Sequence, residues 1–236
     1  MKNGYFDFTS AVLRLFPEKT RAKMRMSIAV ALEKKLSRDL PERQFQLSDE
    51  HIARCRLVAN RQQLLGLLPA GGVAAELGVY RGDFASQILD ICQPVQLFLV
   101  DPWKPDFQNA RESVNSNEEF TRSRFSREIE NGKVHIVKEE SAVALEQFRD
   151  DFFDWVYIDS DHSYEYTKKE LQLASRKVKK NGFICGHDYT KGTWYAWVRF
   201  GVVEAVNEFC LSYGYEFMYL TVEPSMYFSY ALRKIQ

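Results

Sequence analysis

Residues 73–92 read VAAELGVYRGDFASQILDIC, which combines a short apolar strand, a turn with two glycines and a helix. Residues 73–77 have the length and apolar character of a buried strand, and residues 83–92 have helical spacing. The turn between them, Glu76-x-Gly78-x-x-x-Gly82, lets the chain bend sharply and lets a ligand approach the backbone. This stretch predicts the first strand–helix unit of a parallel α/β sheet.

The same alternation of apolar strands and helices continues toward the C-terminus. Further strands are expected at 96–100, 134–138, 155–158, 183–186, 217–221 and 226–232, and the last two form an antiparallel hairpin. We therefore predict an α/β fold with a doubly wound, mostly parallel, seven-stranded sheet that helices cover on both faces.

Charge divides the chain into two parts, although the formal net charge is zero. Residues 1–65 contain 13 Lys and Arg against 7 Asp and Glu, so the rest of the chain carries the opposite excess. Helical patterns cover 20–40 and 48–68, and the sequence PAGG at 69–72 then breaks the chain. We expect residues 1–68 to form a basic helical extension that acts as a lid or a dimerisation element. Residues 69–236 would form the sheet domain, and the extension favours a homo-oligomer.

Composition argues against several other classes of protein. A zero net charge lacks the basic excess that is typical of nucleic-acid binders. No apolar run approaches the ~20 residues of a membrane-spanning helix. The start, MKNGYFDFTS, lacks the pattern of a signal peptide, and four widely spaced cysteines suggest neither a zinc site nor a disulfide framework. We expect a cytoplasmic protein without a nucleic-acid partner and without stable membrane insertion.

Ligands of such sheets bind beyond the carboxyl ends of the parallel strands, so the residues that follow each strand are the informative ones. Glu76, ahead of the first glycine, suits a positively charged ligand group such as an ammonium or a sulfonium. Asp101 suits the two ribose hydroxyls of an adenosine. Tyr80 stands where a dinucleotide fingerprint has its middle glycine, which disfavours a bound dinucleotide. Three further groups follow strands: Glu140-Ser141, the sequence DSDH at 159–162, and the sequence GHDY at 186–189.

Four runs together resemble class I S-adenosylmethionine-dependent methyltransferases: VAAELGVYRGDFASQIL, LVDPW, YIDSDHSYEYTKKEL and NGFICGHDY, in this order. Within that class the chain most resembles small-molecule O-methyltransferases that include macrocin O-methyltransferase and, more distantly, catechol O-methyltransferase. The resemblance covers roughly residues 70–232. It implies S-adenosylmethionine as the cofactor and a hydroxylated small molecule, such as a sugar or a secondary metabolite, as the methyl acceptor.

The resemblance also implies roles for individual residues. The methionine end of the cofactor would lie against Glu76, Gly78 and Gly82, the ribose on Asp101, and the adenine between Glu140 and Ser141. Tyr80 is also predicted to bind the cofactor. Asp159 would bind the cofactor and, as in metal-dependent members, a divalent ion, with Asp188 as a second ligand. Many of those members have Asp or Asn at the next position, which is Tyr189 here, and His187 is the candidate substitute.

Physical chemistry supports a cation at this rim independently of the resemblance. Carboxylates that converge on one place repel each other unless a cation or protons intervene, and Mg²⁺ accepts one or two protein carboxylates. The alternative is that Asp159 only binds the amino group of the cofactor and that Asp188 caps the next segment. His162 and His187 compete for the role of general base, and either could instead only orient a loop.

The acceptor is expected beside the loop that follows the strand at 183–186. Its aromatic residues suit an apolar or sugar-like face, and Arg199 suits a carboxylate or a phosphate. The loop residues that we predict to bind the acceptor are Trp194, Tyr195, Trp197 and Arg199.

Two other functions fit a sheet of this kind. One is a nicotinamide-dependent oxidoreductase, against which the missing middle glycine and the terminal hairpin count. The other is a non-catalytic binding module that retains the cofactor fold, against which the acids at the strand ends count.

Overall fold

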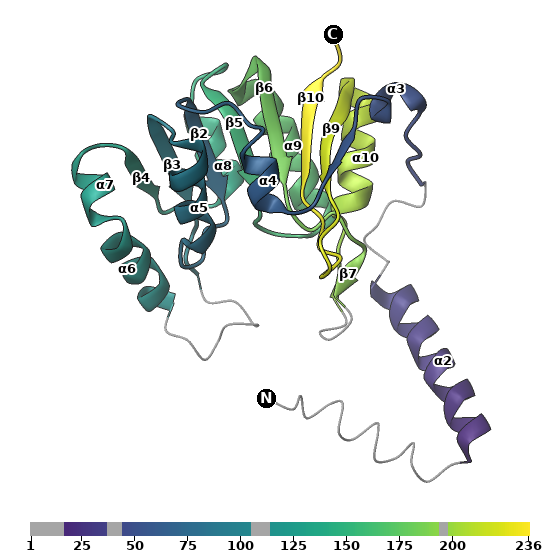
Figure 1. Cartoon of the computed structure of the whole chain (residues 1–236). Helices are drawn as coiled ribbons and strands as arrows, with labels where there is room; N and C mark the ends of the chain where they lie inside the picture. The colour runs from purple at the N-terminus through teal and green to yellow at the C-terminus, as the bar shows by residue number, and fades with distance from the viewer. Residues whose placement is uncertain (1–16, 37–43, 105–113, 194–197) are drawn as a thin grey trace.

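A computed structural model describes residues 17–36, 44–104, 114–193 and 198–236 (Figure 1). Strands and helices alternate over most of this length, as the sequence predicts. In chain order they are α2 (Glu18–Leu36), α3 (Asp49–Ile52), β1 (Arg56–Val58), α4 (Arg61–Leu65), β2 (Val73–Leu77), α5 (Asp83–Cys92), β3 (Gln96–Val100), α6 (Val114–Arg124), α7 (Ser126–Glu130), β4 (Val134–Val137), α8 (Ser141–Gln147), β5 (Phe153–Ile158), α9 (Tyr164–Lys177), β6 (Val178–Gly186), β7 (Gly192–Thr193), β8 (Val198–Arg199), α10 (Val202–Tyr213), β9 (Tyr215–Thr221) and β10 (Tyr230–Lys234).

One sheet organises the molecule, in the strand order β1-β9-β10-β6-β5-β2-β3-β4. The strands from β6 to β4 pair in parallel, and β10 is antiparallel to both of its neighbours, β6 and β9. This confirms the mostly parallel α/β sheet and the antiparallel C-terminal hairpin. The prediction of seven strands is wrong, because the sheet has eight.

The additional strand, β1, lies where the sequence pattern predicted one helix over 48–68. Arg56–Val58 pairs in parallel with the edge of β9, and this non-local pairing outweighs a weak helical pattern. Asn60 then starts α4 by accepting a hydrogen bond on its side chain from the backbone N–H of Gln63. Residues 56–65 thus contribute a strand and a short helix to the sheet-containing body.

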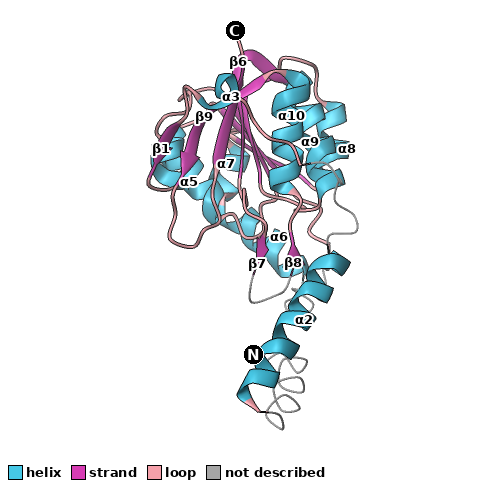
Figure 2. Cartoon of the chain, turned by 90° about the vertical axis from the view of Figure 1, so that its right-hand side faces the viewer, coloured by secondary structure: helices cyan, strands magenta, loops and turns pink. Residues whose placement is uncertain are grey.

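Helices cover both faces of the sheet (Figures 1 and 2). On one face α8, α9 and α10 pack through buried residues such as Leu145, Leu171 and Phe209. On the other face α4 and α5 pack through Leu64 and Ile88. The sheet is therefore buried on both sides, as its nearly continuous apolar strands require.

Helix α2 projects from the end of the sheet near β7 and β8 and contacts β8 (Figures 1 and 2). Along its described part Met26, Ile28 and Val30 are exposed. The role of this helix as a lid or a dimerisation element stays a prediction.

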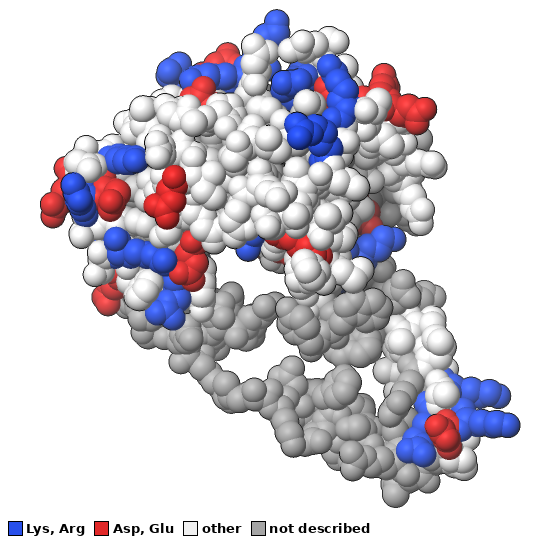
Figure 3. Space-filling model, in the orientation of Figure 1, with Lys and Arg blue, Asp and Glu red and all other residues white. Residues whose placement is uncertain are grey.

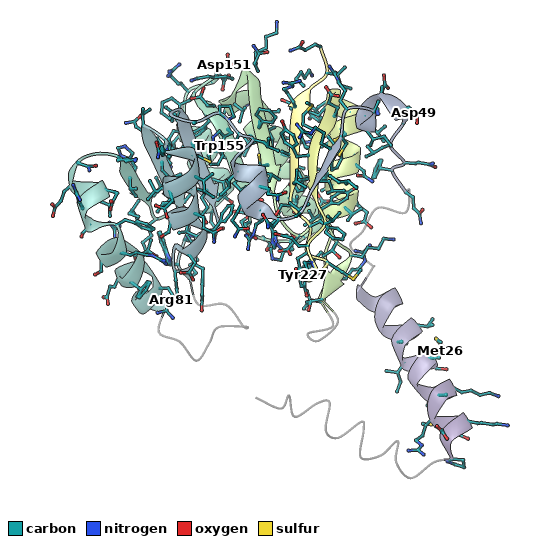
Figure 4. All side chains as sticks on the ribbon, in the orientation of Figure 1. Met26, Asp49, Arg81, Asp151, Trp155 and Tyr227 are labelled. Atoms are coloured by element: carbon teal, nitrogen blue, oxygen red, sulfur yellow. The ribbon has the colours of Figure 1, made fainter. Side chains whose placement is uncertain are left out.

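The carboxyl ends of β2, β3, β5 and β6 meet at one edge of the sheet, and β7 lies at this same edge (Figure 1). Figure 4 places Arg81 and Tyr227 at this edge, Trp155 in the middle of the sheet and Asp151 at the opposite edge. Asp and Glu side chains, with Lys and Arg beside them, show at the same edge in Figure 3. The topology therefore brings the acids predicted at the strand ends together.

Candidate functional site

A cavity of about 680 Å³ opens at the carboxyl ends of the strands. Its volume is in the range of small-molecule and cofactor sites. Most of the residues predicted to bind the cofactor line it: Glu76, Gly78, Tyr80, Asp101, Glu140, Ser141 and Asp159, together with His162. Gly82 does not line it but precedes α5 as the N-cap, with a left-handed φ of 73°.

The glycine turn is built for close approach between two strand ends. Gly78 has a φ of 90°, and a Cβ added there would lie 2.0 Å from the carbonyl oxygen of Asp159. Only glycine fits this position, because both the backbone conformation and the space exclude a side chain. Gly78 thus holds the loop after β2 against the loop after β5.

Asp101 fixes the same turn from the end of β3. Its Oδ2 accepts hydrogen bonds from the backbone N–H groups of Val79 and Tyr80 at 2.8 and 2.9 Å, and its Oδ1 accepts one from Trp103. The indole N–H of Trp103 in turn donates to the carbonyl of Tyr80 at 2.9 Å. Asp101 therefore shapes the loop, and a carboxylate keeps further lone pairs with which to accept ribose hydroxyls.

The far side of the cavity is a chain of polar side chains after β4. Glu140 accepts hydrogen bonds from Lys104 at 2.8 Å and from the hydroxyl of Tyr166 at 2.9 Å. The hydrogen bond from Lys104 is the main reason that the pKa of Glu140 lies below its usual value. The Ser141 hydroxyl donates to Glu170, and its oxygen lies 3.2 Å from the hydroxyl oxygen of Tyr166.

Glu170 is a fully buried carboxyl group behind the cavity. Its Oε1 accepts from the hydroxyls of Ser141 and Ser160, which follow two different strands, and its Oε2 has no partner among the described residues. Burial raises the pKa of Glu170 to about 8. Glu170 is therefore mostly protonated at neutral pH, and it connects the loop after β4 with the loop after β5.

Glu76 is the buried acid at the methionine end of the expected cofactor site. Its side chain is almost completely buried, and its Oε2 has no hydrogen-bond partner in the described parts of the chain. Burial, reinforced by the negative charge of Asp159, raises the pKa of Glu76 well above its usual value. An unsatisfied buried carboxylate oxygen fits a ligand ammonium, since such a group would otherwise carry the full cost of desolvation.

Two histidines join the acids after β5 and β6. His162 Nε2 lies 3.1 Å from Asp188 Oδ2, and Asp159, His162 and Asp188 each present one ligand atom within 4.8 Å of the others. His187 Nδ1 lies 3.3 Å from Asp188 and 3.6 Å from Asp159. Asp188 has a φ of 56°, a conformation that is uncommon for a residue other than glycine and is found more often at functional sites.

The charges of this cluster compensate each other. Burial alone would lower the pKa of His187, but Asp159 and Asp188 outweigh it and raise the pKa to about 9. Burial would likewise raise the pKa of Asp159, but His187 and Arg61 outweigh it and lower that pKa. The predicted residues Asp159, Asp188 and His187 thus lie together, and the group whose ligand atoms lie within 4.8 Å of one another is Asp159, His162 and Asp188.

Of the predicted acceptor residues only Arg199 is described, and it does not line the cavity. Trp194, Tyr195 and Trp197 lie outside the described residues. Arg199 donates to the carbonyl oxygen of Lys191 at 2.7 Å and to Glu204 at 2.5 Å, so it holds its own loop together. Tyr189, at the position where many metal-dependent relatives have a ligand, donates its hydroxyl to Asn207 at 2.7 Å.

Sequence reasoning missed Arg61, Trp103 and Glu170. Trp103 lies within the run LVDPW, so its position two residues after Asp101 was an available signal. Arg61 comes from the segment predicted to be a separate extension, and no motif marks it. Glu170 lies inside a helix, where its burial cannot be recognised from an ordinary polar sequence.

Comparison with known proteins agrees with this geometry. Residues 75–189 match the model of a family described as "Methyltransferase domain". A comparison with curated proteins gives no match.

Solved structures with the same fold include methyltransferases. The pyocyanin biosynthetic protein PhzM has a TM-score of 0.54 at 12% identity, over 73% of this chain and 53% of that one. The Bacillus subtilis tRNA methyltransferase TrmK has a TM-score of 0.52 at 10% identity, over 75% and 66%. SMU.1697c from Streptococcus mutans, in complex with SAH, has a TM-score of 0.51 at 10% identity, over 73% and 94%. The chain spans little more than half the length of PhzM.

These findings define a class I methyltransferase fold with a methyltransferase domain at its centre. The match identifies residues 75–189 as a methyltransferase domain, and together with the fold it supports an S-adenosylmethionine-dependent methyltransferase. The match favours a methyltransferase over the oxidoreductase and the binding-module interpretations. Among the described residues, none of the helices has the length and apolarity needed to span a membrane.

Replacement of Gly78 by alanine tests the close approach of the two strand-end loops. We expect Gly78→Ala to weaken S-adenosylhomocysteine binding about tenfold or more, because Cβ would displace the Asp159 loop. Gly132→Ala is the matched control, since Gly132 also has a positive φ of 77° but has open space around it. It should lose only about 1–2 kcal/mol of stability and retain binding. Calorimetric titration measures the affinity of both variants for S-adenosylhomocysteine. Equal affinities would contradict the proposed role of Gly78.

The raised pKa of Glu170 predicts that the free energy of unfolding depends on pH. Because the folded protein holds a proton on this group up to about pH 8, while the unfolded chain releases it near 4.5, stability should fall as the pH rises through this window. Glu170→Gln cannot lose a proton there, so its free energy of unfolding should decline less between pH 5 and 8 in urea titrations. Parallel pH profiles for both proteins would show that Glu170 is not protonated in the native state.

Proposed function

We propose that the protein methylates a hydroxyl group of a small molecule, such as a sugar or a secondary metabolite. The observation that carries this proposal is the group of Asp159, His162 and Asp188, which combines an aspartate-oriented histidine with a second carboxylate. Two of its members, Asp159 and His162, also line the cofactor cavity. This group therefore lies where the acceptor would meet the methyl group.

The chemistry of a hydroxyl acceptor explains why such a group is needed. A hydroxyl oxygen is a weak nucleophile until it loses its proton, so its methylation benefits from a general base. Asp188 would orient the ring of His162 and stabilise its positive charge, and His162 would accept the proton. When bound, S-adenosylmethionine would supply the methyl group to the deprotonated acceptor oxygen, with S-adenosylhomocysteine as the other product. Holding both reactants in one cavity makes this displacement effectively unimolecular.

The residues present fit a divalent cation. Asp159 and Asp188 offer two carboxylates, which suits Mg²⁺ with water and substrate oxygens as its other ligands, and His162 offers a nitrogen close by. When bound, such an ion lowers the pKa of a hydroxyl and orients it. His187 bridges the same two carboxylates, so the cation would compete with this imidazole for their charge.

Charge also favours a small acceptor over a nucleic acid. The rim around His162 carries Asp159, Asp161 and Asp188, and Glu223 lies 4.0 Å from His187. A phosphate backbone is attracted by lysine and arginine and would be repelled by these acids. TrmK is described as a tRNA methyltransferase and PhzM as a pyocyanin biosynthetic protein. These descriptions apply to those two proteins, which share only 10% and 12% identity with this chain.

An activity screen tests the proposal. The enzyme with radiolabelled S-adenosylmethionine should methylate at least one member of a panel of catechols, sugars and hydroxylated secondary metabolites, and the product should contain a new O–CH₃ bond. Asp188→Asn should lower kcat about 100-fold or more because His162 loses its orienting carboxylate. Thorough chelation should lower activity, and Mg²⁺ should restore it.

Asp151→Asn is the matched control for this change. Asp151 has a positive φ of 53°, which Asn tolerates, and it lies at the opposite edge of the sheet (Figure 4). It should retain wild-type activity. Transfer to RNA or to an amine, or equal activity of the two variants, would refute the proposed chemistry. Activity unchanged after chelation would refute the cation alone.

A further inference from the structure

Arg61 reaches the cofactor cavity from outside the matched methyltransferase domain, which begins at residue 75. Its backbone is anchored to the sheet, because its N–H donates to Glu223 Oε1 at 2.9 Å. Immediately before it, β1 pairs with β9, and the carbonyl of Val58 accepts from the N–H of Val222 at 2.9 Å. Immediately after it, Leu64 and Leu65 are fully buried in the core. The start of α4 is therefore a fixed part of the cavity wall.

The side chain of Arg61 points to the methionine end of the cavity. Its Nη1 lies 3.3 Å from Asp159 Oδ2, and its guanidinium carbon lies 4.7 Å from the centre of the Phe84 ring. Only 29% of the side chain is exposed. The positive charge of Arg61 also acts on Glu76. It lowers the pKa of Glu76 and so partly offsets the increase caused by burial. The guanidinium also hydrogen-bonds the Tyr157 hydroxyl, and with five N–H donors it can still bind a second carboxylate.

The cofactor brings its own carboxylate to this place. The amino-acid end of S-adenosylmethionine carries an ammonium and a carboxylate on the same carbon atom. The unpaired Oε2 of Glu76 suits the ammonium. The attached carboxylate then lies near two protein acids, Glu76 and Asp159, and needs a cation beside it.

Three Lys or Arg side chains are among the described residues that line the cavity. Lys104 pairs with Glu140 on the far side. Arg81 lies over the ring of Phe120 on α6, at 4.3 Å, near the lower edge in Figure 4. Arg61 is the one that contacts Asp159.

We propose that Arg61 binds the carboxylate of the methionine moiety of S-adenosylmethionine, so that the segment before the methyltransferase domain completes the cofactor site. Arg61 would then discriminate cofactors that carry this carboxylate from those that lack it. The inference rests on the cofactor and is independent of the acceptor, so a failure of the proposed O-methylation leaves it standing.

Decarboxylated S-adenosylmethionine is the probe that isolates this contact. It retains the ammonium and the sulfonium and lacks only the carboxylate. Calorimetry on the full chain should show that the wild type binds S-adenosylmethionine more tightly than the decarboxylated form. Arg61→Leu should weaken binding of S-adenosylmethionine about 10- to 100-fold and change binding of the decarboxylated form much less.

Two further variants make the test decisive. Arg81→Leu, which also removes a cavity arginine, should leave the ratio of the two affinities unchanged. Arg61→Lys keeps the charge and should retain part of the preference, which covers the case in which Arg61→Leu does not fold. Equal affinity of the wild type for the two ligands would overturn the proposal. A loss in Arg61→Leu that is equal for both ligands would also overturn it, because Arg61 would then only hold Asp159 in place.

Discussion

Negative charge gathered at the carboxyl ends of β2, β5 and β6 is the constraint on which the rest of the structure depends. Glu76, Asp159 and Asp188 lie at one edge because parallel strands end there, and carboxylates so close together repel unless cations separate them. The protein supplies Arg61 and His187 for this purpose. The methyl donor, with its sulfonium and ammonium, supplies more positive charge. Acids arranged in this way suit a ligand that presents an ammonium group, and a sulfonium strengthens the attraction.

The backbone makes this arrangement rigid. Gly78 allows two loops to touch, and Asp101 holds the N–H groups of the intervening turn while Trp103 closes it. Behind the cavity, buried Glu170 connects two more loops through serine hydroxyls. The site is thus held by hydrogen bonds that begin and end on strand termini, which is the usual way in which a parallel sheet positions a ligand.

Much of this could be predicted from the sequence because strand-end residues follow recognisable strands. Residues 73–77 and 96–100 are strands and 83–92 is a helix, as the apolar pattern indicated, and most of the acids assigned to the cofactor line one cavity. The strand that was not predicted, β1, is three residues long. It is stabilised by pairing with a strand about 160 residues away in the sequence, which a local sequence pattern cannot indicate. The role of Arg61 was missed for the same reason, since the position of this residue depends on β1. One basic residue of the N-terminal segment, Arg61, meets the acidic rim at Asp159.

The central claim is that the acids at the strand ends bind S-adenosylmethionine. The most direct measurement is a calorimetric titration of S-adenosylhomocysteine into the wild type and into Glu76→Gln, whose side chain has nearly the same shape but no charge. We expect one site per chain in the wild type and an affinity about tenfold or more lower in the variant, because the buried carboxylate no longer meets the ammonium. Absence of binding to the wild type, or equal affinity of the two proteins, would contradict it.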